Sequence, residues 1–177
     1  RDYLNAEFPG VECDDTPPPP PPPQASCGID LALVLDASGT IDAGEAAQMK
    51  TAVNSFVDTL IPATPTLFSV TKFNTTASVL LGFSGNATTI KNSVNSITTG
   101  SWTNWEQGLV QGNSTYDPRP SIPNVIIFAS DGQPNRYGVN GTLGSGMFDA
   151  AALAAAVAQA NTIKASGTRI ITLGVGT

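Results

Sequence analysis

Two uninterrupted, mainly apolar runs of strand length dominate the hydrophobic pattern of the chain. They are IDLALVL at residues 29–35 and NVIIFA at residues 124–129. A strand in the interior of a parallel sheet is covered on both faces, so it reads as a continuous apolar run instead of an alternation. We therefore expect both segments to be central strands of a sheet.

The segment after the first of these runs has apolar residues at helical spacing. Asp42 and Glu45 stand at the two positions of a capping box at a helix start. Apolar residues then recur at helical intervals until Pro62, which is expected to end the helix. In a later, alanine-rich helix, Leu153 and Val157 are predicted to form the apolar stripe. The further helices are predicted at residues 90–97, 104–114 and 150–165.

Three more segments complete the predicted sheet. Residues 67–73 and 77–83 are separated by a short polar turn, which favours an antiparallel hairpin, and residues 168–175 form a last strand. Strands that alternate with helices predict a doubly wound α/β domain with a mostly parallel central sheet, one antiparallel edge strand and helices on both faces. In such sheets ligands bind beyond the carboxyl ends of the strands, at a topological switch point.

The N-terminal part of the chain does not follow this alternation. Residues 1–16 are acidic, and residues 17–24 are a proline run closed by a glutamine. Fixed φ angles and missing N–H donors make such a run an extended polyproline II tail of roughly 20 Å. We expect an acidic segment, a stiff spacer and an α/β domain at residues 25–177. The run also resembles hydroxyproline-rich surface glycoproteins, which implies hydroxylation and O-glycosylation of Pro17, Pro18, Pro19, Pro20, Pro21, Pro22 and Pro23.

The two cysteines, Cys13 and Cys27, flank the proline run. A disulfide between them would have to bring their Cα atoms to about 6 Å across a stiff spacer of roughly 20 Å, which is strained. We therefore expect each cysteine to form a disulfide with a residue outside this sequence. Two reduced, buried cysteines of an intracellular protein are the alternative.

Composition narrows the classes of function. The 177 residues include no histidine, which excludes Ser-His-Asp and Cys-His catalytic sites and histidine-ligated metals. The net charge is −6 with eight Lys and Arg, so no nucleic-acid partner is expected. No apolar stretch approaches the roughly 20 residues of a membrane-spanning helix. Because the sequence begins at Arg1 without a signal segment, we expect a processed chain or a piece of a longer one.

Two polar clusters follow the two central strands directly. Asp36, Ser38 and Thr40 come after the first strand, and Asp131 comes after the second. Two carboxylates side by side at one edge of a sheet need a cation or a shared proton. Ligands that are all oxygen favour a hard cation such as Mg²⁺, Mn²⁺ or Ca²⁺. The alternative is ordinary turn chemistry, since Asp, Ser and Gly are common in turns.

The order of these residues resembles the signature of von Willebrand factor A domains. D-A-S-G-T at residues 36–40 is similar to the family's D-x-S-x-S motif, and Thr103 and Asp131 match its later threonine and aspartate. The resemblance implies a metal-ion-dependent adhesion site (MIDAS). Ser38, Thr40 and Thr103 would offer hydroxyls to the ion, and Asp36 and Asp131 would hold it directly or through water. Mg²⁺ is the expected ion, with Ca²⁺ and Mn²⁺ as alternatives.

Two features depart from the family's pattern. Thr40 stands where serine is usual, but it supplies the same hydroxyl oxygen, so ion binding is expected to survive. The family continues beyond the last predicted strand with another helix and strand, so we expect a domain that lacks these two elements. Because that helix moves in the members that switch affinity, no switch is inferred here.

The implied function is recognition of a partner, and no enzymatic activity is expected. An ion held partly by neutral hydroxyls keeps a net positive charge, which favours an Asp or Glu carboxylate of a partner protein as a further ligand. Candidate partner contacts in the neighbouring loops are Trp102, Trp105, Arg136 and Tyr137. Core packing is the alternative for the two tryptophans, and an ordinary surface loop is the alternative for residues 132–148.

Four N-x-Ser/Thr sequons fall in predicted turns, helix ends or loops, where a glycan could reach solvent. Together with the proline run and the resemblance to adhesion domains, they indicate an extracellular glycoprotein, secreted, on a cell surface or in a matrix. The candidate asparagines are Asn74, Asn86, Asn113 and Asn140.

Two other functions are compatible with the sequence. One is a structural subunit of an extracellular filament or cell-wall assembly, which contacts neighbouring subunits and has an incidental metal site. A remote one is a phosphohydrolase of the haloacid-dehalogenase type, which D-A-S-G-T also resembles. Ser38 stands where that chemistry needs a second carboxylate as general acid, which weakens this alternative.

Overall fold

The computed structural model of the protein describes residues 28–176, apart from residues 118 and 120. The acidic segment 1–16, the spacer 17–24 and both cysteines therefore lie outside the described residues. The expectations for the proline run and for the disulfides stay predictions.

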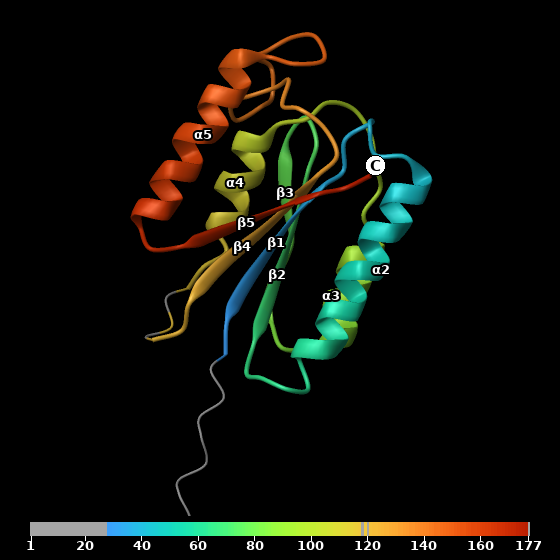
Figure 1. The fold of residues 1–177 in the computed structure, drawn as a ribbon, viewed down its shortest axis with the longest axis vertical. Coiled ribbons are helices and arrows are strands. Elements are labelled where there is room, and N and C mark those ends of the chain that lie inside the picture. The colour runs from blue at the N-terminus through green and yellow to red at the C-terminus, as the bar shows by residue number, and fades with distance from the viewer. Residues whose placement is uncertain (1–27, 118, 120, 177) are drawn as a thin grey trace, which may run out of the picture.

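A five-stranded sheet forms the centre of the domain, with the strand order β3-β2-β1-β4-β5 (Figure 1). Strand β1 pairs in parallel with β2 and β4, and β4 pairs in parallel with β5. Strand β3 lies at one edge and is antiparallel to β2. The predicted mostly parallel sheet with one antiparallel edge strand is confirmed. The strands are β1 (Asp30–Asp36), β2 (Leu67–Phe73), β3 (Ala77–Ser84), β4 (Asn124–Ser130) and β5 (Arg169–Gly174).

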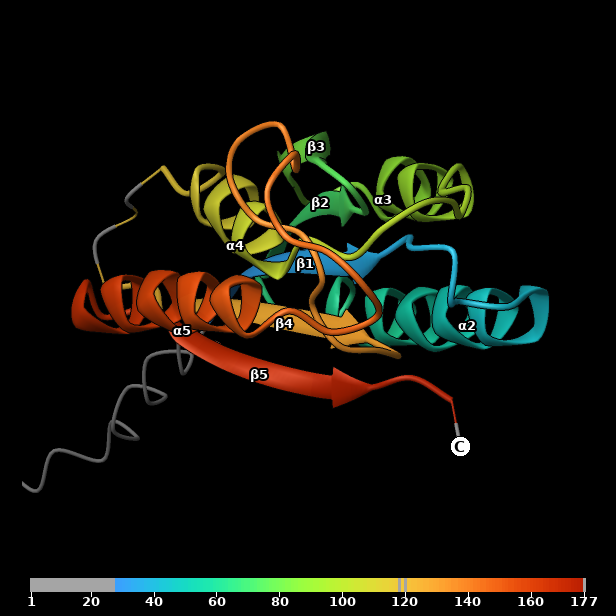
Figure 2. The same ribbon diagram turned by 90° about the horizontal axis from the view of Figure 1, so that it is seen from above.

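Helices cover both faces of the sheet. Helices α2 and α3 lie side by side on one face, and α4 and α5 lie side by side on the other (Figures 1 and 2). Each face has its own apolar cluster: Leu33 of β1 belongs to the cluster under α2 and α3, and its neighbour Val34 belongs to the cluster under α4. This two-sided burial explains the continuous apolar run of β1. The helices are α2 (Ala43–Leu60), α3 (Ala87–Asn95), α4 (Trp105–Asn113) and α5 (Ala150–Ala165).

The start of helix α2 is the predicted capping box. The Asp42 carboxylate accepts hydrogen bonds from the N–H groups of Gly44 and Glu45, at 2.6 and 2.8 Å. The Glu45 carboxylate accepts one from the N–H of Asp42 at 3.0 Å. Asp42 therefore satisfies helix-terminal donors.

The buried face of α5 is formed mainly by small side chains. Ala152, Ala156 and Ile163 are buried, whereas Val157 is 50% exposed and Leu153 is half-buried. Helix α5 packs beside α4, and small alanine side chains let two helices approach closely. Leu153 and Val157 lie one helical turn apart, as the predicted stripe requires, but the side chains buried beneath α5 are two alanines and an isoleucine.

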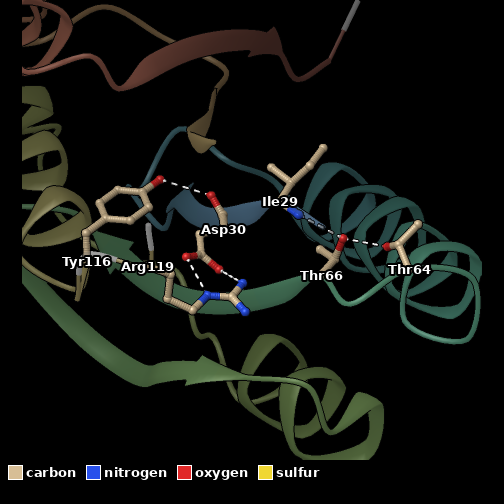
Figure 3. Close-up of polar contacts among 6 residues, drawn as sticks. All are labelled: Ile29, Asp30, Thr64, Thr66, Tyr116 and Arg119. Atoms are coloured by element: carbon tan, nitrogen blue, oxygen red, sulfur yellow. Dashed lines mark hydrogen bonds and ion pairs between the residues drawn. The ribbon is translucent and has the colours of Figure 1, made fainter. Parts of the chain in front are cut away.

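An ion pair closes the amino end of the sheet (Figure 3). The buried carboxylate of Asp30, the first residue of β1, accepts hydrogen bonds from two nitrogens of Arg119, one of them Nε at 2.9 Å. The Tyr116 hydroxyl donates to the backbone carbonyl of Asp30 at 3.5 Å. The pair connects the loop after α4 to the central strand.

Among the described residues, no helix is long and apolar enough to cross a lipid bilayer.

Replacing Arg119 with methionine is expected to lower the free energy of unfolding by about 2 kcal/mol, because the buried Asp30 carboxylate would lose its cation. Denaturant unfolding would measure the loss. The double variant Asp30→Asn/Arg119→Met is expected to recover part of it, since no unpaired charge stays buried. Equal stabilities of the wild type and Arg119→Met would contradict the structural role of the pair.

Candidate metal centre

Polar loops meet at the carboxyl ends of β1 and β4, seen from above in Figure 2. The loop after β1 lies against the loop before α4 through two backbone hydrogen bonds. Gly39 N–H donates to the Ser101 carbonyl at 2.9 Å, and Gly100 N–H donates to the Ala37 carbonyl at 2.8 Å. A Cβ atom at Gly39 would lie 3.0 Å from the Ser101 oxygen, so glycine permits this close approach. The contact brings the Thr103 loop to the D-A-S-G-T loop.

Asp36 ends β1 with a fully buried side chain. One carboxylate oxygen accepts a hydrogen bond from Ser38 N–H at 2.7 Å, and the other accepts one from the Ser130 hydroxyl at 2.5 Å. Burial raises the pKa of Asp36 to about 6, against the lowering effect of the hydrogen bonds from Ser130 and Ser38; the negative charge of Asp131 adds to the rise. Because burial disfavours the charged form of this carboxylate, a nearby cation would stabilise that form.

Ser38, Thr40 and Asp131 form a chain of side-chain hydrogen bonds. The Thr40 hydroxyl donates to the Asp131 carboxylate at 2.9 Å, and the oxygens of Ser38 and Thr40 lie 3.0 Å apart. Thr40 and Asp131 are 91 residues apart in the sequence. Pairing of β1 with β4 brings the two polar clusters together.

Thr103 is held in place by its backbone. Its carbonyl accepts hydrogen bonds from the N–H groups of Asn135 and Arg136, at 3.0 and 3.1 Å. Its own N–H donates to the Asn135 side-chain oxygen at 2.9 Å. Asn135 thus fixes the position of Thr103, a role that sequence reasoning missed because an asparagine in a Gly-rich loop gives no distinguishing signal.

Ser130 and Trp105 connect the sheet to α4 beneath the polar cluster. The Trp105 indole N–H donates to the Ser130 oxygen at 3.1 Å, and the Ser130 hydroxyl donates to Asp36. The Trp105 ring packs edge-on against Phe128 at 5.7 Å. The polar atom of Trp105, a candidate partner contact, is therefore engaged within the domain. Ser130 directly follows the predicted strand 124–129, but no local pattern indicates that its hydroxyl reaches Asp36.

Trp102 and Arg136 lie on the rim of the cluster. The Arg136 guanidinium lies 3.8 Å from the centroid of the Trp102 ring, a cation–π contact, and Trp102 is 46% exposed. Tyr137 is half-buried and pairs through its backbone with Leu143. These side chains belong to loops that carry Thr103 and follow Asp131.

The side-chain atoms of this cluster that could bind a metal ion are all oxygens. It combines the carboxylates of Asp36 and Asp131 with the hydroxyls of Ser38 and Thr40, and Thr103 is held nearby. Within residues 28–176, apart from 118 and 120, no group of three or more His, Cys, Asp or Glu could hold a metal. A cation here would depend on hydroxyl ligands as well as carboxylates, which fits a hard divalent ion.

A pH dependence follows from the raised pKa of Asp36. Between its ordinary pKa near 3.8 and its folded pKa of about 6, the folded state binds more protons than the unfolded state. The free energy of unfolding of metal-free protein is therefore expected to rise by about 1 kcal/mol from this group as the pH falls from 7 to 5. Denaturant unfolding at both pH values, in the presence of a chelator, measures the rise. Asp36→Asn should remove that contribution; an unchanged slope in this variant would contradict the assignment.

The four sequon asparagines differ in exposure. Asn86 and Asn140 are exposed, and Asn74 and Asn113 are half-buried. The Asn86 side-chain oxygen caps α3 by accepting a hydrogen bond from Thr89 N–H at 3.0 Å. The exposed positions are the more accessible to a glycan, and glycosylation stays a prediction.

Residues 30–177 match the family model described as von Willebrand factor type A domain. Among solved structures, PilB minor pilin from Streptococcus sanguinis has a TM-score of 0.70 at 18% identity, over 86% of this chain and 51% of that one. Proximal thread matrix protein 1 from the mussel byssus, with a zinc-occupied MIDAS motif, has a TM-score of 0.66 at 26% identity. The match covers 86% of this chain and 37% of that one. BatB from Bacteroides thetaiotaomicron has a TM-score of 0.64 at 18% identity, and the match covers 83% of this chain and 66% of that one. The chain thus spans less than two thirds of the length of each of these three proteins. No curated protein matches the sequence.

Proposed function

The chain belongs to the von Willebrand factor type A domain family, and on this premise we propose that it is an extracellular binding module that uses a divalent cation to hold an acidic residue of a partner protein. The observation that carries the proposal is the Ser38–Thr40–Asp131 hydrogen-bond chain beside the buried Asp36. It joins three of the five proposed ligands at the carboxyl ends of β1 and β4, which supports a shared ion site there. The module would belong to a larger surface or matrix glycoprotein.

Five side chains would hold the ion: Asp36, Ser38, Thr40, Thr103 and Asp131. The zinc-occupied MIDAS of the mussel matrix protein supports a divalent cation, and Mg²⁺ is the proposed ion, with Ca²⁺ and Mn²⁺ as alternatives. When bound, the ion would supply a positive charge that attracts a partner's carboxylate.

The chain's own residues would prepare this site before the ion arrives. Ser130 and the N–H of Ser38 orient the Asp36 carboxylate, and Asp131 accepts a hydrogen bond from Thr40 and so fixes the direction of that hydroxyl. Asn135 fixes the backbone of Thr103 from both sides. Ligands that are already oriented lose little conformational entropy on binding.

Calorimetric titration of Mg²⁺, Ca²⁺, Mn²⁺ and Zn²⁺ into chelator-stripped protein tests the proposal. Saturable binding of one ion per chain is expected, and its heat should disappear when a chelator is in excess. If none of the four ions binds, the proposed function is wrong.

An alternative function is a structural subunit of an extracellular assembly. One edge of β5 has no neighbouring strand in the described sheet, and Ile171 and Leu173 on that strand are each about half exposed. An exposed strand edge can pair with another chain. The mussel byssus and pilin likenesses are compatible with such an assembly, as are disulfides from Cys13 and Cys27 to other chains. Self-association that persists in excess chelator would favour this alternative.

A further inference from the structure

Strand β5 is an edge strand without the features that usually protect such an edge. In the part of the chain that the structure describes, no strand pairs with its outer side (Figure 2). Its pairing with β4 is regular over six consecutive residue pairs, whereas β3, at the other edge, pairs with β2 through register shifts. Its sequence, RIITLG, has no proline, and its one charged residue, Arg169, stands at its start. Bulges, prolines and charges are what keep exposed edges from pairing with other chains.

One face of β5 carries uncovered apolar side chains. Ile171 and Leu173 pair with Ile127 and Ala129 of β4, which belong to the apolar cluster under α2 and α3, so they point to that face of the sheet. They are nevertheless each about half exposed. An apolar groove separates Leu173 from α2 and is lined on the helix side by Met49. These side chains add apolar surface to the unpaired backbone of the edge, which favours pairing with another strand.

The backbone of β5 offers three outward-facing residues to a further strand. Val175 N–H donates to the Ser130 carbonyl of β4 at 3.0 Å. Successive residues of a strand direct their N–H and C=O groups to opposite sides, so Ile170, Thr172 and Gly174 direct theirs away from β4. An antiparallel copy of β5 pairs with all three in one register, which sets Thr172 opposite Thr172 of the second copy. A two-fold axis through that pair generates this register, so both copies contribute the same surface.

The side chains of the two strands are compatible in this register. On the α2 face, Ile171 lies opposite Leu173 of the second copy, and symmetry repeats the pair, so four apolar side chains come together. On the other face, Ile170 lies opposite Gly174 of the second copy. A Cβ atom at Gly174 would have no neighbour within 4 Å, so there is room for the isoleucine.

The charges at the two ends of β5 are complementary as well. Arg169 opens the strand, and Lys164 lies in the last turn of α5, just before it. At the other end, a Cβ atom at Gly176 would overlap the Glu45 carboxylate, so Glu45 stands beside the chain that follows β5. The carboxylates of Asp42 and Asp131 belong to the same end, and the buried ion pair at the amino end of β1 adds no net charge.

An antiparallel pair places the basic end of each β5 against the acidic end of the other. Arg169 lies opposite Val175 of the second copy, one residue before Gly176, and therefore near Glu45 of that copy. Opposite charges on paired strands stabilise the pairing, and like charges oppose it. Of the two strand directions, the charges thus favour the antiparallel one.

We propose that the protein forms a two-fold symmetric dimer in which the β5 edges of two copies pair antiparallel and join their five-stranded sheets into one. The dimer specifies how the extracellular assembly named above as an alternative function begins, and it does not depend on the metal centre. Because the joined strands run in opposite directions, the two candidate metal centres lie at opposite ends of the combined sheet. One dimer can therefore hold two partners.

Analytical ultracentrifugation of the full chain tests the dimer. In excess chelator and reductant, which remove association through a shared ion or through Cys13 and Cys27, the wild type is expected to shift from monomer to dimer. The shift is expected between about 10 and 500 μM, since an interface built on one strand pair is small and weak. Ile171→Lys, which puts charges among the apolar pairs, should stay monomeric. Val79→Lys, on the edge strand β3, is the matched control and should dimerise like the wild type.

A charge reversal tests the register. Arg169→Glu would bring carboxylates together at both ends of the strand pair, and the dissociation constant of the dimer is expected to rise about tenfold. Adding Glu45→Gln removes this repulsion and keeps a residue type that suits a capping box, so it should recover part of the loss. Circular dichroism on each variant verifies that it is folded.

The outcomes separate the dimer from the metal-dependent function. A monomer at every concentration overturns the dimer, as does a dimer that Ile171→Lys leaves intact. Association that appears only without chelator or reductant also overturns it, and failure of Glu45→Gln to recover Arg169→Glu overturns the register. Cation binding is measured separately by calorimetry, so loss of either result leaves the other standing.

Discussion

Replacing Asp131 with alanine is expected to weaken divalent-cation binding by about 100-fold or more, to the point where calorimetry detects no saturable heat. Residues that only orient a metal's ligands typically change its affinity by about 10- to 100-fold, and Asp131 is proposed to hold the ion itself, directly or through water. The change removes one of the site's two carboxylates and leaves the Thr40 hydroxyl without its acceptor. Asp131 is half-buried at the end of β4, so the fold is expected to survive. Circular dichroism would verify that the variant is folded.

Asp42→Ala is the matched control for this variant. Asp42 lies six residues after Asp36, but its carboxylate caps α2. Its loss is expected to lower the free energy of unfolding by about 1 kcal/mol while leaving cation affinity unchanged. The opposite pattern, with cation binding lost in Asp42→Ala and kept in Asp131→Ala, would place the ion elsewhere.

The largest effect on stability is expected from Gly112→Ala. Gly112 lies on the buried side of α4, where a Cβ atom would overlap Cγ2 of Val34. Val34 is fully buried in the central strand and cannot move aside, so helix and sheet would have to separate. Overpacking of this kind costs about 1–3 kcal/mol, and we expect the upper end despite the better helix propensity of alanine. For a domain of this size, the melting temperature should fall by roughly 5–10 °C.

Gly82→Ala gives the control for that change. Gly82 lies in β3, and no atom lies within 4 Å of the position that its Cβ would take. The same substitution is therefore expected to change the free energy of unfolding by less than about 0.5 kcal/mol. Thermal unfolding of both variants beside the wild type measures the difference. Similar melting temperatures for the two variants would show that α4 does not depend on this close approach.

Local sequence patterns determined much of the fold. The apolar run of β1 predicted a strand covered on both faces, and the Asp42–Glu45 pair predicted where α2 begins. Such features depend on residues that are near in the sequence, because strand and helix periodicity and capping are properties of a few consecutive residues. The Asp36, Ser38 and Thr40 cluster could be recognised for the same reason.

Contacts between distant segments required the tertiary structure. The register of β1 against β4 brings Asp131 to Thr40, and no local pattern contains that register. The hydrogen bond from Ser130 to Asp36 joins residues 94 positions apart, and the one from Thr103 to Asn135 joins residues 32 positions apart. Which face of α5 is buried was likewise settled by packing against α4, since alanine fits on any face. The sequence by itself determined the elements and the chemistry of their ends, and only the packing of the elements determined which of those ends meet.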